Sequence, residues 1–153
     1  MLPVKLNLGC CDAPLRDFVN VDLIAAPGVD LVTDLRRAWP WLDSTIAYIR
    51  AWDIIEHLPD KILTMNEAWR VLEPQGRIEI AVPTTDGPGA FQDPTHVSFW
   101  NRRSFVYYEA GNLYRDRFAA FYGIVAKFAV KSERIDISVD GPRLTITLEA
   151  VKP

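Results

Sequence analysis

The stretch Lys5-Leu6-Asn7-Leu8-Gly9-Cys10, close to the start of the chain, decides the fold. Val4–Leu8 has the pattern of a β-strand, and Gly9 ends it. A glycine directly after a strand has no Cβ, so a ligand can approach the backbone there. We therefore predict that the first element is a strand whose carboxyl end is suited to binding a ligand.

Short apolar runs and helical patterns alternate after this strand. Apolar residues recur every three or four positions up to Leu72, which predicts a helix over Ile54–Leu72. Glu73-Pro74-Gln75-Gly76 ends this helix, because proline and glycine both interrupt helices. Such alternation is typical of a largely parallel sheet covered by helices. The further strands predicted here are Val19–Asp22, Val29–Thr33, Thr45–Ala51 and Arg77–Val82.

In the last part of the chain the alternation of strands and helices ends in a long loop, one helical segment and a pair of strands. Residues 84–101 are rich in Pro, Gly, Thr and Asp and predict a long loop, a length that is more often functional than idle. Arg102–Tyr122 has a helical pattern with many aromatic residues. Two strands, Ala126–Val139 and Leu144–Val151, flank the turn signal Asp140-Gly141-Pro142. We predict one α/β domain over residues 1–153, with a mostly parallel sheet that ends in an antiparallel hairpin.

The composition is that of a globular domain, with 153 residues, 49% hydrophobic and 24% charged. No apolar run approaches the roughly 20 residues of a membrane span, and the first residues lack a signal-peptide pattern. Cys10 and Cys11 are adjacent, so they form no stabilising disulfide and lack the spacing of a zinc site. We expect a cytoplasmic protein that has no membrane contact and no metal site.

The charge is unevenly distributed around a formal net charge of −3. Residues 102–134 carry an excess of Lys and Arg, which mildly favours an anionic partner, whereas a solvated helix face is the alternative. A dedicated duplex-binding protein has a denser basic stripe, so we do not expect a nucleic acid partner. The aromatic stretch 105–122 is a candidate face for a homo-oligomer.

Acidic residues follow two of the predicted strands. In open parallel sheets, ligands bind at the carboxyl ends of the strands, where the strand order reverses. Asp22 ends the second strand and can accept hydrogen bonds from both hydroxyls of a ribose, and Asp34 can accept one from an adenine amino group. Acidic residues after strands also cap helices and make turns, so the ordered set, and no single member, indicates a nucleoside site.

These segments resemble the class I S-adenosylmethionine-dependent methyltransferases, and most of all a short bacterial branch of predicted methyltransferases. The resemblance covers nearly the whole chain. The segments that carry it are Lys5–Cys10, Val19–Asp22, Val32–Leu35, Ile54–Pro59, Glu67–Arg77, Asp93–His96, Phe99-Trp100 and Ser104-Phe105.

The resemblance implies a Rossmann-like methyltransferase fold with a seven-stranded sheet. It also implies that the chain binds S-adenosyl-L-methionine and transfers a methyl group to an unidentified acceptor, which we expect to be a small molecule. Asp22 would hold the ribose, and Asp34 with Leu35 would flank the adenine. The residues implied in cofactor binding are Asn7, Gly9, Cys10, Cys11, Asp22, Leu23, Asp34, Leu35, Ala51 and Trp52.

Three residues depart from the family pattern. Cys11 stands where the family has a second glycine, so its Cβ would crowd the cofactor or require a left-handed backbone. Asn7 replaces an acidic residue in the first strand, and Gln75 replaces another glycine. These departures favour the alternative that the chain is a noncatalytic relative, acting as a partner or scaffold subunit.

The candidates for a general base are Asp53, His57, Asp93 and His96. Methyl transfer mainly requires alignment, and a base is needed only where the acceptor must lose a proton. Histidine suits this role near neutral pH, and our hypothesis is that His96 faces the acceptor. In the alternative, Asp93-Pro94-Thr95-His96 is a structural turn in which Asp93 accepts hydrogen bonds from nearby amides.

Trp52 also has two interpretations, as a π-face for the sulfonium or as a core residue. A nicotinamide-dependent oxidoreductase would need G-x-G-x-x-G after the first strand, and the chain has Gly9-Cys10-Cys11-Asp12-Ala13-Pro14 there. A metal-dependent hydrolase built on Asp93 and His96 lacks a visible third ligand in the sequence.

Overall fold

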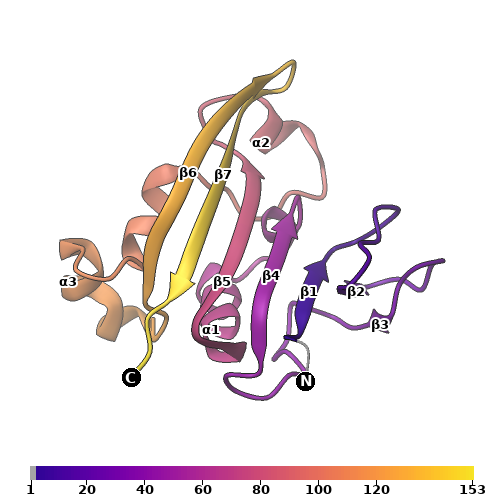
Figure 1. Ribbon diagram of the computed structural model, residues 1–153. Coiled ribbons are helices and arrows are strands. Elements are labelled where there is room, and N and C mark those ends of the chain that lie inside the picture. Colours follow the sequence, from indigo (N-terminus) through magenta and orange to yellow (C-terminus); the bar gives the residue numbers. More distant parts are fainter. Residues whose placement is uncertain (1–2) are drawn as a thin grey trace.

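The computed structural model describes residues 3–153, which form one seven-stranded sheet in the order β3-β2-β1-β4-β5-β7-β6 (Figure 1). The strands β3, β2, β1, β4 and β5 run parallel to one another. The strand β7 is antiparallel to both of its neighbours, β5 and β6. The predicted α/β fold, mostly parallel with an antiparallel hairpin at its end, is confirmed. The strands are β1 (Lys5–Leu8), β2 (Val19–Asp22), β3 (Leu31–Val32), β4 (Ile46–Trp52), β5 (Leu72–Pro83), β6 (Phe128–Ser138) and β7 (Gly141–Ala150).

The helix predicted over Ile54–Leu72 is wrong in its first part. A 3-10 turn, η1 (Ile55–His57), comes first, and the α-helix α1 (Lys61–Val71) starts only after Pro59. The proline favours an extended backbone at the residue before it, and Leu58 has φ −99° and ψ 119°. Asp60 then caps α1, because its side chain accepts hydrogen bonds from the Ile62 and Leu63 amides.

The helix predicted over Arg102–Tyr122 is also interrupted. It consists of a 3-10 helix, η2 (Arg102–Tyr107), and an α-helix, α3 (Leu113–Tyr122). The first helix ends at Tyr107, Gly111 has a φ of +75° in the turn that follows, and Asn112 caps the second helix. The loop predicted over residues 84–101 contains one short helix, α2 (Gly89–Gln92).

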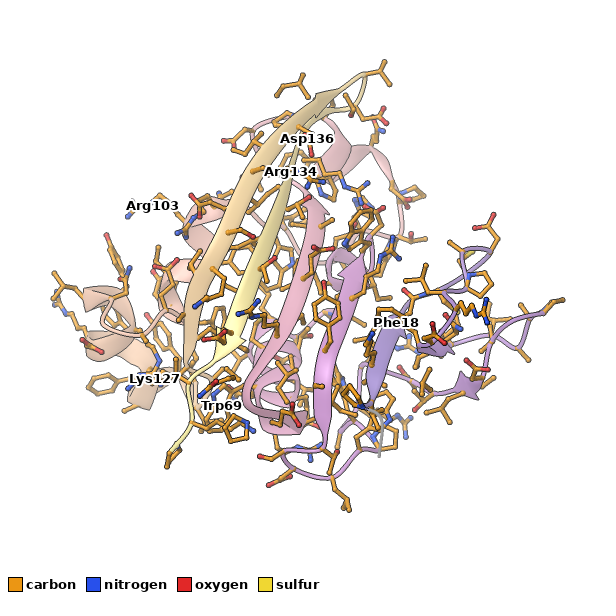
Figure 2. The ribbon with its side chains drawn as sticks, viewed as in Figure 1. Phe18, Trp69, Arg103, Lys127, Arg134 and Asp136 are labelled. Carbon is orange, nitrogen blue, oxygen red and sulfur yellow. The ribbon has the colours of Figure 1, made fainter. Side chains whose placement is uncertain are left out.

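The helices leave one face of the sheet bare. In Figure 1 they lie behind the sheet or beside its β6 edge. Ile49, Ile78 and Ile146 are buried on the covered face, in one core with Met65 and Ala68 of α1. Long polar and aromatic side chains stand on the other face, and Figure 2 shows Phe18 and the β6 pair Arg134 and Asp136 there. The central residues of this bare face are Tyr48, Arg50, Trp52, Arg77 and Glu79.

Both ends of the described chain lie at the same end of the sheet, the one at which the parallel strands start (Figure 1). The strand β1 starts at this end, and Lys152 donates hydrogen bonds to the carbonyls of Arg70 and Leu72 at the start of β5. The carboxyl ends of β1, β4 and β5 lie at the opposite end. Within residues 3–153 no helix has the length and apolar character that crossing a membrane requires.

Candidate functional site

A cavity of about 120 Å³ lies at the carboxyl ends of β1, β2 and β3. These strands are parallel, so the residues that follow them meet at one edge of the sheet. The cavity combines two acidic residues with apolar side chains and borders the glycine that ends β1. The residues that line it are Gly9, Asp22, Leu23, Thr33, Asp34, Leu35, Arg36, Ile54, His57 and Leu58.

Asp22 is held in place by backbone amides. The Cys11 amide donates to its Oδ2 atom at 2.9 Å, and the Leu23 amide donates to its Oδ1 atom at 2.8 Å. Cys11 has a left-handed φ of +44°, one of the two outcomes that the sequence predicted for a residue with a Cβ at this position. The Ile24 amide also donates to Oδ1, at 3.2 Å, so one lone pair, on Oδ2, is left for a further donor such as a ribose hydroxyl.

Asp34 is bound by a neighbouring arginine. The Arg36 guanidinium donates to both carboxylate oxygens of Asp34, at 2.8 and 3.0 Å. These hydrogen bonds, together with that of the Arg36 amide, lower the pKa of Asp34. Asp34 therefore lines the cavity as a paired carboxylate, and an adenine amino group would share it with Arg36.

Ile54 lies directly against Gly9. A Cβ placed on Gly9 would come within 2.9 Å of the Ile54 side chain, and Gly9 has a φ of +64°. The position therefore requires glycine on both steric and conformational grounds. The Ile54 side chain also occupies the space beside the glycine, and this limits the cavity on that side.

A second cavity of about 320 Å³ adjoins the first, and His57 lines both. It lies between η1, the loop that contains α2, and the β6–β7 turn. Most of its lining is polar. The residues that line it are Asp53, Glu56, His57, Pro83, Gly89, Gln92, Asp93, His96, Ser138, Asp140, Gly141, Pro142 and Arg143.

Both histidines are oriented by hydrogen bonds through Nδ1. His96 Nδ1 lies 3.0 Å from the Ala90 carbonyl oxygen, so Nδ1 is the protonated nitrogen and donates. His57 Nδ1 lies 3.2 Å from the Thr95 carbonyl oxygen. The Thr95 hydroxyl donates to Asp93, so it has no proton left for His57, and we assign the proton to Nδ1 here as well. In the neutral imidazoles Nε2 then carries the lone pair, and Nε2 of His96 lies 3.8 Å from Oδ2 of Asp93.

Glu56 lies beside the two histidines in this cavity. One ligand atom from each of Glu56, His57 and His96 lies within 4.8 Å of the others, and the imidazole centroids are 4.9 Å apart. Glu56 is 2% exposed, and its Oε2 atom has no hydrogen-bond partner within residues 3–153. Burial raises the pKa of Glu56 to about 7. Glu56 was not among the site residues predicted from the sequence.

Asp53 is joined to the last hairpin of the sheet. Its Oδ2 atom lies 2.8 Å from Nη2 of Arg143 on β7, and Asp53 itself has a left-handed φ of +51°. Asp93 forms the turn that its sequence predicts, because the Thr95 amide and hydroxyl both donate to its Oδ1 atom. These hydrogen bonds lower the pKa of Asp93. Asp53 and Asp93 thus have structural partners at the rim of the second cavity.

A third hollow lies elsewhere on the described surface. It has a volume of about 610 Å³ and is bordered by Asp60, Lys61, Tyr107 and Tyr122. These residues come from the start of α1 and from η2 and α3, away from the strand ends. It contains none of the predicted site residues, so we place the candidate site at the two smaller cavities.

Solved structures share this architecture. A SAM-dependent methyltransferase from Methanosarcina mazei superposes with a TM-score of 0.67 and 12% identity, over 100% of this chain and 95% of its own length. This is the class I methyltransferase fold. No protein-family model and no curated protein matches the sequence. The bacterial branch suggested by the resemblance stays a prediction.

Other proteins with the methyltransferase fold act on different acceptors. The 1,6-didemethyltoxoflavin-N1-methyltransferase from Burkholderia thailandensis, solved with 1,6-didemethyltoxoflavin and S-adenosylhomocysteine, has a TM-score of 0.65 and 15% identity over 98% of this chain and 72% of its own. A 16S rRNA (adenine(1408)-N(1))-methyltransferase from Catenulisporales acidiphilia has a TM-score of 0.57 and 14% identity over 99% of this chain and 86% of its own. The shared fold therefore does not identify an acceptor.

Three of the predicted cofactor residues have other contacts within this fold. Asn7 is buried and bonds to Asn20, Arg50 and the Ala13 carbonyl, so it anchors the first crossover. Ala51 is fully buried in β4. Trp52 lies on the bare face, where its indole N–H donates to Glu79 and its ring stacks 4.0 Å from the Arg50 guanidinium.

Proposed function

We propose that the chain is an S-adenosylmethionine-dependent methyltransferase that acts on a small acceptor. The observation that carries this proposal is the junction of the two cavities at His57. The adenosyl group would occupy the cavity beside Asp22, and the acceptor would occupy the one beside His96. Such a pair of adjoining sites is what transfer between two bound molecules requires.

The first cavity suits the adenosyl half of the cofactor. Leu23, Leu35 and Leu58 offer apolar contacts to a base, and Asp22 offers acceptors for the ribose. Its volume of about 120 Å³ is below the roughly 300–1,000 Å³ of typical small-molecule sites. We infer that the methionine half binds when the Ile54 side chain moves away from Gly9.

The chain's own residues would align the reactants. When bound, S-adenosylmethionine supplies a methyl group on an activated sulfonium. Asp22 fixes the ribose, Gly9 allows close approach of the ligand to the backbone, and the Nε2 atom of His96 can accept a proton from the acceptor. His57, at the boundary of the cavities, is a second candidate for this proton.

The second cavity favours an acceptor that is neutral or cationic. Four carboxylic groups face it, against one arginine, Arg143. Like charges repel more strongly in a partly desolvated site, so this lining disfavours the anionic acceptor that the basic segment 102–134 suggested. The carboxylic residues are Asp53, Glu56, Asp93 and Asp140.

Calorimetric titration with S-adenosylhomocysteine tests the proposal. We expect the wild-type chain to bind, and Asp22→Ala to weaken binding about 10–100-fold, because hydrogen bonds to a charged group contribute about 1.5–3 kcal/mol. Asp12→Ala, a change of the same type outside the cavity, should leave the affinity unchanged. Ile54→Ala should tighten binding by opening the space beside Gly9.

A scaffold role is the second candidate, and the contact between Ile54 and Gly9 favours it. If Ile54 stays in place, the chain retains the fold without room for the whole cofactor. Absence of binding by both the wild-type chain and Ile54→Ala would support the scaffold and contradict the methyltransferase.

A further inference from the structure

The cluster of Glu56, His57 and His96 has the chemistry of a metal site. One ligand atom from each lies within 4.8 Å of the other two. Two imidazoles with one carboxylate suit divalent first-row transition metals, whereas Mg²⁺ and Ca²⁺ prefer sites made of oxygen atoms. The three side chains converge from η1 and from the end of the Asp93–His96 turn.

The unpartnered oxygen of Glu56 is a second, independent observation. Its Oε2 atom is buried without a hydrogen-bond partner within residues 3–153, in a residue that is 2% exposed. Nearly all buried polar atoms in folded proteins have a partner, so an orphan carboxylate oxygen beside two imidazoles indicates an absent ligand. In its ionised form the Glu56 carboxylate accepts, so a metal ion or a hydrogen-bond donor would satisfy this oxygen.

The histidines are prepared as ligands. Both Nδ1 atoms donate to backbone carbonyls, those of Thr95 and Ala90, and this fixes the tautomer with the lone pair on Nε2. Metal-binding histidines are typically oriented in this way, through a hydrogen bond from the nitrogen that does not bind the metal. The hydrogen bonds therefore set both the protonation and the direction of the two rings.

The backbone holds the two segments together without an ion. The amides of Val97 and Ser98 both donate to the Glu56 carbonyl, at 2.9 and 3.0 Å. The Ser98 hydroxyl donates to the Ile55 carbonyl and accepts from the Trp100 indole. The positions of the three ligands thus follow from the fold, which reduces the ordering needed when a ligand binds.

We propose that Glu56, His57 and His96 bind one divalent transition-metal ion of the Zn²⁺ type. Three protein ligands leave at least one coordination position open, and here it would face the second cavity, where a water or an acceptor atom can bind. The site goes beyond the methyltransferase proposal, because an ion can bind whether or not the adenosyl cavity is used. An ion on Nε2 also removes the free base from the same histidine.

Zinc titration of the full chain without an affinity tag, after treatment with a chelator and dialysis, tests the site. Calorimetry should show one Zn²⁺ per chain. The chain has two histidines, both in the cluster, so nitrogen NMR of imidazoles reports on this site alone. We expect both Nε2 signals to shift on zinc addition while both Nδ1 atoms stay protonated.

Variants make the assignment specific. Glu56→Gln should lower zinc affinity at least about 10–100-fold, the loss seen when groups that only orient a ligand are removed. His57→Gln should do the same, and it provides a test that does not depend on how the buried position of Glu56 tolerates change. Asp140→Asn, in the same cavity, and Cys11→Ser, at the exposed thiol, should retain the wild-type affinity.

Three results would overturn the proposal. They are absence of zinc binding by the wild-type chain, unchanged affinity in both cluster variants while circular dichroism shows them folded, and loss of binding in Cys11→Ser. S-adenosylhomocysteine is titrated into the same samples. Failure of the metal site and failure of the methyltransferase proposal are then separate observations.

Discussion

At the scale of single residues, the chain keeps glycine-like backbone conformations where it lacks glycine. Cys11 has φ +44° and Gln75 has φ +66°, and these are two of the positions where the family pattern expects glycine. A left-handed conformation costs a residue with a Cβ roughly 1–2 kcal/mol. The left-handed backbone at both positions is therefore held at some cost in stability.

Replacing Cys11 with glycine should stabilise the protein. Relief of the left-handed strain outweighs the extra entropy of glycine in the unfolded chain, so we expect a gain of about 0.5–1 kcal/mol in the free energy of unfolding, measured with denaturant. Asp12→Gly is the control, because Asp12 lacks a positive φ and should lose stability. A loss in Cys11→Gly equal to that of the control would contradict the strain argument.

Glu67 should make stability depend on acidic pH. Its carboxylate accepts from the Trp39 amide at 2.6 Å and from Arg70 at 2.7 Å, and the ion pair with Arg70 lowers its pKa. The stabilisation is present above the unfolded pKa of about 4.3 and is lost as the pH falls through the lower native value.

Glu67→Gln should therefore destabilise the protein by about 2 kcal/mol at neutral pH and flatten the decline in stability below about pH 4.3. Denaturant titrations of both proteins across this pH range provide the measurement. If the difference in the free energy of unfolding between the two proteins stays the same as the pH falls, Glu67 is not the titrating group.

The sequence identified part of the site and missed another part. Asp22 was predictable because it ends a strand, and the structure places it beside Gly9 in a cavity. Glu56 was not singled out, because an acidic residue near the start of a predicted helix resembles a solvated one. Arg143 comes from a strand 90 positions beyond Asp53, its ion-pair partner, and no local pattern reports such a contact.

At the scale of elements, start and stop signals outweighed periodicity. The strands were predictable from their apolar runs: β2 has the predicted bounds, and the bounds of the others differ by one to five residues. The two long predicted helices were wrong in their continuity, because segments that contain Pro59 and Gly111 interrupt patterns that stay apolar across the break. Side-chain periodicity describes which face is buried and contains no information on whether the backbone is continuous.

The cap of α1 provides a test of this reasoning. The Asp60 side chain accepts from the Ile62 amide at 3.0 Å and from the Leu63 amide at 2.9 Å. Asp60→Ala should lower the free energy of unfolding by about 1 kcal/mol, measured with denaturant, because two amides lose their acceptor. The exposed Asp12→Ala should stay within about 0.5 kcal/mol of wild type. A similar small effect of both changes would show that Asp60 does not cap the helix.

At the scale of the whole molecule, helices cover only one face of the sheet, so we expect side chains on the covered face to contribute most to stability. The accessible surface is 8414 Å², above the roughly 7,800 Å² typical of a monomer of 17.3 kDa. Because only one face of the sheet is covered, neighbouring residues of β7 differ in how far their side chains are buried. Ile146 is fully buried beneath the helices, whereas Thr147 is half-buried on the bare face.

Alanine substitution of these neighbours should reveal the asymmetry. We expect Ile146→Ala to lower the free energy of unfolding by about 2–5 kcal/mol, because it leaves a cavity in the core. Thr147→Ala should cost less than about 1 kcal/mol. Chemical denaturation of both variants measures the difference. Equal losses would indicate that a partner or a second copy covers the bare face in solution.

The positions of the chain ends have a practical consequence. The start of β1 and the C-terminus lie at the end of the sheet opposite to the carboxyl ends of β1, β4 and β5 (Figure 1), and residues that follow these strands line the two cavities. A biotin group or a fluorescent dye joined to either end, and a sensor surface that captures it, would therefore stay clear of incoming ligands. Candidate acceptors can therefore be screened on the chain immobilised through either of its ends.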